Sequence, residues 1–111
     1  MREIDSAELA AGLDSKVLVD IRQPNEWRST GVIKGCHLLT FTEADINGWL
    51  DQLGKLVGPE DQLVLVCRTG RRTGVLLDFL NSQTSYRRAQ HLAGGILGWI
   101  DNDLPVVAVD P

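Results

Sequence analysis

One stretch of the sequence decides the fold, and it reads Leu63-Val64-Leu65-Val66-Cys67-Arg68-Thr69-Gly70-Arg71-Arg72-Thr73-Gly74. Four apolar residues lead into a cysteine, and a short segment with one glycine and three arginines follows; apolar residues then recur at positions 75, 76, 79 and 80. A short, bounded apolar run is typical of a buried strand, and the later spacing is typical of a helix. We therefore predict a buried strand, a tight loop and a helix, with Cys67 where the strand ends.

The loop after Cys67 combines features that favour an anion. Backbone N–H groups at the start of a helix lack partners within the helix, and the helix dipole adds partial positive charge there. Arg68, Arg71 and Arg72 add full charges. A thiol in such a setting is expected to have a larger thiolate fraction, and thiolate is the reactive form. Cysteines buried for packing alone are common, but such a site would not collect three cations, so we predict that Cys67 is a nucleophile beside an anionic substrate.

Size and charge limit the classes of function. The sequence has 111 residues, enough for one domain, and its net charge is -4. The net negative charge argues against general nucleic-acid binding. The three arginines near Cys67 form a local positive site on an acidic protein, which suits a small anion. No apolar run approaches the length of a membrane span, and no signal peptide is recognisable at the start. We therefore expect a cytoplasmic protein with neither a nucleic-acid nor a membrane partner.

The two cysteines, Cys36 and Cys67, lie far apart in the sequence and form neither a C-x-x-C pair nor a zinc-type cluster. His37 and His91 also stand alone, and a metal site needs three or four convergent ligands. We expect no metal and no cofactor, and structural or surface roles for both histidines.

The rest of the sequence alternates between strand and helix patterns. A first short strand is expected near Ile4. Further strands are expected at residues 16–21, 36–41 and 89–92, and helices at 5–13, 23–28, 46–54 and 96–100. Such alternation indicates an α/β fold with a parallel sheet covered on both faces. Trp27, Trp49 and Trp99 are expected in the core. Asp20 lies at the C-terminal end of the strand expected at 16–21, near the predicted site, and Arg22 is two residues further on. The two are expected to pair and brace the strand end, because buried charges are usually paired.

Three patches, in this order along the chain, carry a family resemblance. The first comprises residues 18–27 with 31–35, the second is residues 67–73, which follow the pattern C-x-x-G-x-R-[ST], and the third comprises residues 92–99 with 104–106. On these patches, which together span most of the chain, the sequence resembles the single-domain rhodaneses, a family of thiosulfate sulfurtransferases. The resemblance implies one rhodanese domain over residues 1–111. It also implies a three-layer fold, with a mainly parallel central sheet of about five strands and helices on both faces.

The sequence departs from the family pattern at Val32, Lys34 and Cys36. All three fall in a structural turn away from the loop, so they bear little on catalysis. Cys36 is expected to be a packed small residue, with a second redox thiol as the alternative.

The resemblance implies a two-step reaction. The catalytic Cys67 takes a sulfane sulfur from thiosulfate or a related persulfide donor and holds it as a persulfide. A thiol or cyanide then accepts the sulfur, and a protein acceptor such as a thioredoxin-like protein is a further expectation. The expected substrate-binding residues are Arg68, Thr69, Gly70, Arg71, Arg72 and Thr73. Arg72 aligns with the arginine of the family loop, the orientations of Arg68 and Arg71 stay open, and Thr73 either caps the helix or bonds within the loop.

Two alternatives remain. Cysteine phosphatases also use a strand, a loop and a helix, but their loop is C-x5-R, whereas Cys67 to Arg72 is C-x4-R and makes a tighter cradle. A rhodanese-like module without enzymatic activity, or a sulfur-relay protein that acts through a protein partner, belongs to another class of function. Such binding modules often lack the cysteine that is present here.

Overall fold

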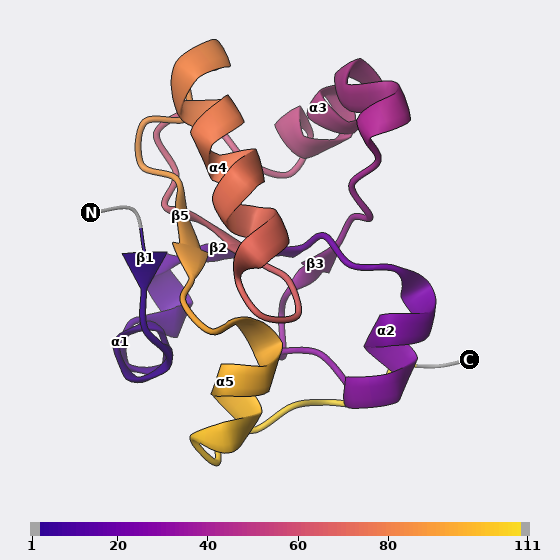
Figure 1. Cartoon of the computed structure of the whole chain (residues 1–111). Coiled ribbons are helices and arrows are strands. Elements are labelled where there is room, and N and C mark those ends of the chain that lie inside the picture. The colour runs from indigo at the N-terminus through magenta and orange to yellow at the C-terminus, as the bar shows by residue number, and fades with distance from the viewer. Residues whose placement is uncertain (1–2, 110–111) are drawn as a thin grey trace.

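The computed structural model describes residues 3–109, and its centre is a sheet of five parallel strands (Figure 1). The strands are β1 (Glu3–Ile4), β2 (Val17–Asp20), β3 (His37–Leu38), β4 (Leu63–Val66) and β5 (Gln90–Leu92). Their order in the sheet is β1-β5-β4-β2-β3, and each neighbouring pair is parallel. This confirms the predicted α/β class and the parallel sheet.

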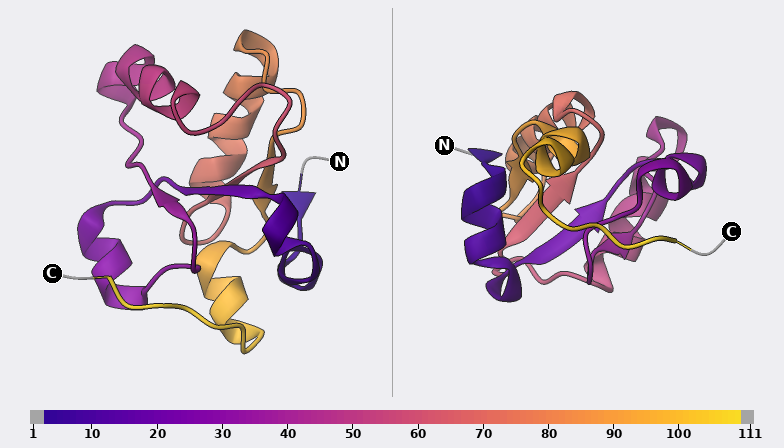
Figure 2. Two further views of the ribbon diagram at one scale, coloured as in Figure 1. Left: turned by 180° about the vertical axis from the view of Figure 1, so that it is seen from behind. Right: turned by 90° about the horizontal axis from the view of Figure 1, so that it is seen from below.

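Helices cover both faces of the sheet, as the views in Figures 1 and 2 show. The helices are α1 (Ser6–Ala11), α2 (Pro24–Thr30), α3 (Ile46–Gly54), α4 (Arg71–Gln83) and α5 (Gly95–Asp101), with short 3-10 turns η1 (Leu13–Ser15) and η2 (Glu43–Asp45). Helices α3 and α4 lie over one face, and α1 and α5 lie over the other. Among the described residues, no helix is both long enough and apolar enough to span a membrane.

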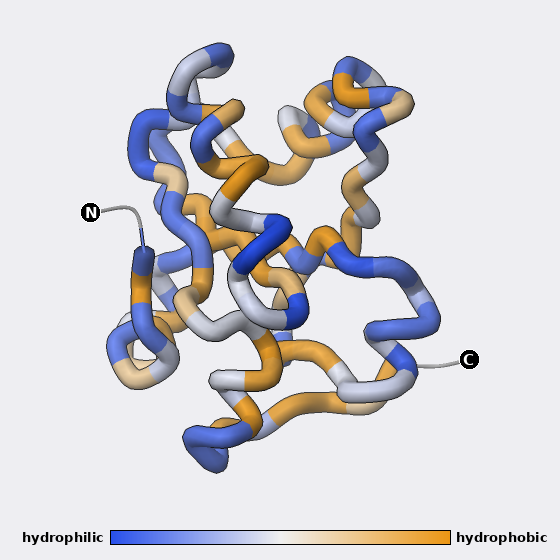
Figure 3. Tube along the Cα trace, viewed as in Figure 1, coloured by the Kyte–Doolittle hydropathy of each residue, from blue (hydrophilic) through white to orange (hydrophobic). Residues whose placement is uncertain are grey.

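The alternation of side chains along β4 explains the two halves of the core. Leu63, Leu65 and the following Cys67 point to the face covered by α3 and α4, and Val64 and Val66 point to the face covered by α1 and α5. All four residues of β4 are fully buried, as expected of a central parallel strand. Figure 3 shows the resulting concentration of apolar residues along the central strands.

Side-chain caps fix where two helices begin. The Asp5 carboxylate accepts a hydrogen bond of 2.8 Å from the Glu8 N–H at the start of α1, and the Asp45 carboxylate accepts one of 3.0 Å from the Gly48 N–H at the start of α3. The three tryptophans are buried, which confirms their predicted place in the core.

Several element boundaries differ from the prediction, and three of these differences are larger or concern the site. The strand expected over residues 36–41 is only His37–Leu38, because β3 is an edge strand and the later residues bond to β2 on one side alone. The first helix ends at Ala11 and continues as the turn η1. Helix α4 begins at Arg71, so Arg71, Arg72 and Thr73 belong to its first turn and not to a loop.

Candidate active site

Cys67 lies at the carboxyl end of the central strand, immediately before the loop that leads into α4. The residue is only 1% exposed and belongs to the core cluster beneath α3 and α4. Only residues 68–70 separate it from the first residue of the 13-residue helix α4. The thiol therefore faces the positive end of the longest helix in the described part of the chain.

Two groups of the loop and helix hold the sulfur. The Gly70 N–H donates a hydrogen bond of 3.2 Å to Cys67 Sγ, and Thr73 Oγ1 lies 3.4 Å from the same atom. Gly70 has a φ of 95°, a left-handed conformation that residues with a side chain rarely adopt. This backbone turn aims the Gly70 N–H at the sulfur, and donors in this arrangement stabilise negative charge on it.

The loop rests on the start of α5. The Ile96 and Leu97 N–H groups donate to the carbonyl oxygens of Cys67 and Arg68, at 2.9 and 3.1 Å. A Cβ at Gly95 would lie only 2.4 Å from the Arg68 oxygen and 2.6 Å from the Cys67 oxygen. Gly95 therefore permits a backbone contact that fixes the path of the chain just after Cys67.

The cations of the site differ in their surroundings. Arg68, Thr69 and Arg71 are exposed. Arg72 instead donates two hydrogen bonds to the carboxylate of Glu26 on α2, at 3.0 and 2.8 Å. These bonds lower the pKa of Glu26 and raise that of Arg72. Arg72 is thus paired in this structure and not free for an anion.

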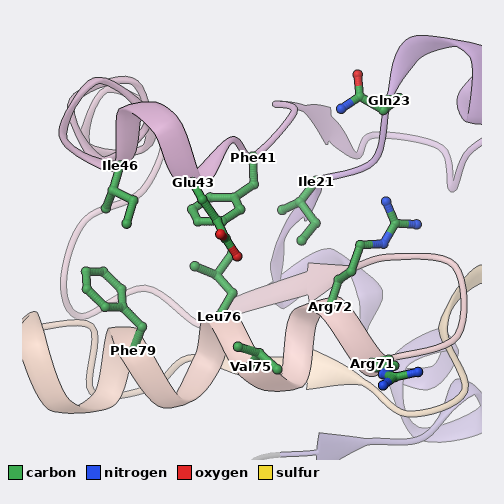
Figure 4. Close-up of a pocket in the computed structure, with 10 residues that line it drawn as sticks. All are labelled: Ile21, Gln23, Phe41, Glu43, Ile46, Arg71, Arg72, Val75, Leu76 and Phe79. Atoms are coloured by element: carbon green, nitrogen blue, oxygen red, sulfur yellow. The ribbon is translucent and has the colours of Figure 1, made fainter.

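A cavity of about 650 Å³ lies beside the loop (Figure 4). Its walls are mostly apolar, with Arg71 and Arg72 at the end nearest to the loop. The lining residues are Ile21, Gln23, Phe41, Glu43, Ile46, Arg71, Arg72, Val75, Leu76 and Phe79. Cys67 does not line the cavity, because it lies buried behind the first turn of α4.

Asp20 and Arg22 form a fully buried ion pair at the carboxyl end of β2, with Arg22 Nη2 at 2.8 Å from Asp20 Oδ2. The Trp27 indole N–H donates to Asp20, and Arg22 also donates to Thr30 Oγ1 and the Gly31 carbonyl. The charges and polar atoms of this pair are all satisfied, so it ties β2 to α2, the helix that carries Glu26.

The second cysteine is not in the site. Cys36 packs against the core cluster under α1 and α5, on the face opposite to Cys67. Burial raises the pKa of its thiol well above the ordinary value, which disfavours the reactive thiolate.

The structure adds His91 to the site, although the sequence suggested only a structural or surface role for it. Its ring is buried, and Nδ1 lies 2.9 Å from Thr73 Oγ1. Glu26 was also missed. Neither position has a local signal, because each meets the loop only through the pairing of distant elements. No three His, Cys, Asp or Glu residues of the described chain are grouped so that they could hold a metal ion.

Comparison with known proteins places the chain in a family. The rhodanese-like domain family matches residues 5–102. A protein named sulfurtransferase from Allochromatium vinosum is 32% identical over 117 aligned positions, which cover 97% of this chain and 96% of that protein.

Comparison with solved structures finds proteins with the same fold. A rhodanese-related protein from Thermoplasma volcanium has a TM-score of 0.79 at 23% identity and covers 98% of this chain and 100% of its own. A Rhodopseudomonas palustris protein of unknown function, described as a possible tyrosine phosphatase, has a TM-score of 0.77 at 23% identity and covers 96% and 85%. With the family match over residues 5–102 and the full-length relative, the chain belongs to the rhodanese-like family.

Proposed function

We propose that the protein is a sulfurtransferase that carries a sulfane sulfur on Cys67. The observation that carries this proposal is the position of Cys67 Sγ, held by the Gly70 N–H and faced by the Thr73 hydroxyl at the start of α4. The relative named sulfurtransferase, similar over nearly the whole chain, supports the same class of reaction.

In the first step, the Cys67 thiolate attacks the outer sulfur of a donor such as thiosulfate. The new S–S bond forms as the donor's S–S bond breaks, and sulfite leaves with the electron pair of that bond. The product is a persulfide on Cys67. Its terminal sulfur carries the negative charge, which backbone N–H groups and the helix dipole stabilise.

In the second step, an acceptor thiolate or cyanide attacks the terminal sulfur of the persulfide. The bond to Cys67 breaks, and Cys67 leaves as the thiolate that began the cycle. No external oxidant or reductant is needed. A protein thiol, such as that of a thioredoxin-like protein, is an acceptor of the same chemistry.

The donor is bound by the cations around the loop. Arg68 and Arg71 are exposed and carry permanent charge, which suits the sulfonate group of thiosulfate. Arg72 joins them when its contact with Glu26 opens. Because Cys67 is only 1% exposed, a donor reaches the sulfur only when the residues that cover it move.

The proposal is tested by incubating the protein with thiosulfate and measuring its intact mass before and after a reductant is added. We expect a gain of one sulfur atom, release of sulfite, and loss of the gain on reduction. Cys67→Ser should show no gain. Cys36→Ser is the matched control and should gain the sulfur, because the Cys36 thiol lies on the other face of the sheet. No adduct with any sulfane donor would refute the enzymatic proposal and favour a binding module.

A cysteine phosphatase is the second candidate, since one similar structure is described as a possible tyrosine phosphatase. Only residues 68–70 separate Cys67 from α4, and the C-x4-R spacing is one residue shorter than the C-x5-R loop of cysteine phosphatases, which argues against a phosphoryl group. Hydrolysis of an aryl phosphate that is abolished in Cys67→Ser would favour the phosphatase.

A further inference from the structure

Three side chains link the Cys67 sulfur to the protein surface. Thr73 Oγ1 lies 3.4 Å from Cys67 Sγ and 2.9 Å from His91 Nδ1. The other ring nitrogen of His91, Nε2, lies 3.5 Å from Glu3 Oε2. Thr73 is 0% exposed and His91 is 7% exposed, whereas the Glu3 side chain is 51% exposed. We call this series Glu3–His91–Thr73–Cys67 the relay.

The sheet and helix α4 bring the relay together. Strand β5 lies between β1 and β4, and its register places His91 beside Glu3 on one side and Leu65 on the other. Helix α4 packs against β5, as Figure 1 shows. A Cβ at Gly70 or Gly74 would lie 3.7 or 3.6 Å from His91 Cε1. The ring therefore occupies the space that two glycines leave under the first turn of α4.

The hydroxyl group of Thr73 has one proton to donate, and more than one acceptor atom lies near it. His91 Nδ1 is at 2.9 Å, the Gly70 carbonyl oxygen is at 3.3 Å, and Cys67 Sγ is at 3.4 Å. A hydroxyl donates one hydrogen bond at a time and accepts others through its lone pairs. The direction of the Thr73 O–H therefore depends on what His91 Nδ1 carries.

When Nδ1 is unprotonated, the Thr73 O–H donates to it, and the sulfur faces only a lone pair of the oxygen. When both ring nitrogens are protonated, Nδ1–H donates to Thr73 Oγ1, and the Thr73 O–H can donate to the Gly70 carbonyl oxygen or to the sulfur. A sulfur that carries negative charge is the stronger acceptor of the two. A hydroxyl that donates to sulfur stabilises the thiolate, and it stabilises the Cys67 sulfur of a persulfide as the leaving group. The second arrangement therefore favours the chemistry.

We propose that His91 is a positioning residue for sulfur transfer, and that its protonation turns the Thr73 hydroxyl from His91 toward the Cys67 sulfur. The effect that we infer for His91 on the rate of sulfur transfer rests on the proposed function. The hydrogen-bonding step itself requires only that Cys67 be a reactive thiol. No bond to carbon or sulfur forms or breaks in this step, and the proton that His91 Nδ1 gains comes from solvent.

The groups that face His91 from the packed elements are few. Glu3 faces Nε2 from β1, the Thr73 hydroxyl faces Nδ1 from α4, and Cys67 lies beyond that hydroxyl at the end of β4. Among residues 3–109, Glu3 is the one ion-pair partner of His91. Arg68, Arg71 and Arg72 keep a constant charge, so they add no step to a pH profile.

The test measures alkylation of Cys67 by iodoacetamide, a neutral reagent, over a range of pH. A Cys36→Ser background leaves one thiol in the protein. We expect the parent rate to show two steps, one from the thiol and one from His91. His91→Asn keeps a polar atom near the position of Nδ1 but does not titrate, so its profile should show one step. His37→Asn is the matched control, because His37 is exposed on β3, and its profile should equal that of the parent.

Thr73 variants test the link between the ring and the sulfur. Thr73→Val removes the hydroxyl at nearly equal volume. On the acidic side of the His91 step, where the protonated ring leaves the hydroxyl to the sulfur, it should slow alkylation about tenfold, the effect of one hydrogen bond to a charged group. Thr73→Ser keeps the hydroxyl and should restore most of the rate. Equal rates in the valine and serine variants would overturn the proposal.

Proton NMR reads His91 directly, because the chain has two histidines and each gives one Hε1 signal. Alkylation of Cys67 should change the titration of His91 and leave that of His37 unchanged. Glu3→Gln removes the charge of the carboxylate that lies 3.5 Å from His91 Nε2 and should change the His91 signal, which keeps the proposal testable should the Thr73 variants fail to fold. A His91→Asn profile that coincides with the parent, or a His91 signal insensitive to alkylation and to Glu3→Gln, would refute it.

The two proposals can fail separately. Should no persulfide form while alkylation still shows the His91 step, sulfur transfer is wrong and the link between His91 and Cys67 stands. Should the persulfide form while His91→Asn leaves the alkylation profile unchanged, sulfur transfer stands and the role of His91 is wrong.

Discussion

Arg72, in the first turn of α4, donates two parallel hydrogen bonds to the carboxylate of Glu26 on α2, with N···O distances of 3.0 and 2.8 Å. The same Glu26 carboxylate accepts the Gln23 N–H at the start of α2. Arg72 is therefore held by α2, and the buried Asp20–Arg22 pair anchors that helix to β2. An anionic donor has to compete with Glu26 for this guanidinium.

Glu26→Gln should release Arg72 for the donor. The glutamine keeps an oxygen for the Gln23 N–H but removes the charge, so we expect the KM for thiosulfate to fall about two- to threefold, in keeping with the strength of exposed ion pairs. Arg72→Ala should lower kcat/KM about tenfold, because it removes a charged donor from the anion.

Arg88→Ala is the control for the loss of one positive charge, since Arg88 is exposed and lies outside the loop. Steady-state kinetics with thiosulfate measures all three variants. An Arg72→Ala value equal to that of Arg88→Ala would show that Arg72 does not bind the donor.

The Glu26–Arg72 pair should make a small, pH-dependent contribution to stability. The hydrogen bonds from Arg72 lower the pKa of Glu26 below its ordinary value of 4.5. The contribution is therefore complete above that value and is lost as the pH falls through the lower pKa of the folded state. Both side chains are partly exposed, so we expect only about 0.5 kcal/mol at neutral pH. Urea unfolding of the wild type and Glu26→Gln should show this difference at neutral pH and none at strongly acidic pH. A difference that grew on acidification would contradict the assignment.

Asp20→Asn should destabilise the fold far more than Glu26→Gln. The substitution leaves the fully buried Arg22 guanidinium without a counter-charge, which costs about 3 kcal/mol or more. Urea unfolding at neutral pH measures the loss. Similar losses in the two variants would mean that the Asp20 charge does not compensate that of Arg22.

Gly95→Ala should disturb the Cys67 loop. Its φ of 62° is unfavourable for alanine, and the new Cβ would lie 2.4 Å from the Arg68 carbonyl oxygen. We expect a loss of about 3 kcal/mol from strain and overpacking together.

Gly35→Ala is the matched control, because Gly35 has a φ of 83° but no atom lies within 4 Å of the position that its Cβ would take. The free energy of unfolding of Gly35→Ala should fall by only about 1 kcal/mol, because of backbone strain alone. Unfolding free energies decide the comparison, and equal losses would mean that the contact between Gly95 and the loop is unimportant.

The sequence determined much of the fold because its signals are local. The apolar run before Cys67 predicts a central strand, since a parallel strand buried on both faces needs apolar residues at every position. The start of the first helix at Asp5 is a local signal too, because capping uses an N–H only three residues away. The predicted length of the edge strand at His37–Leu38 was too great, because the length of an edge strand depends on how far the neighbouring strand continues beside it.

One part of the candidate site also follows from the sequence, and another part depends on the tertiary structure. Cys67 and its short connection to a helix follow from the sequence, because a strand, a glycine and a helix in immediate succession leave the thiol at the helix N-terminus. The partners of that loop were decided by tertiary structure alone. Arg72 meets Glu26, and Thr73 meets His91, only because the sheet order sets α2 on one side of the loop and β5 on the other. Hydrogen bonds act over about 3 Å in space whatever the separation in sequence, so no local pattern could reveal these pairs.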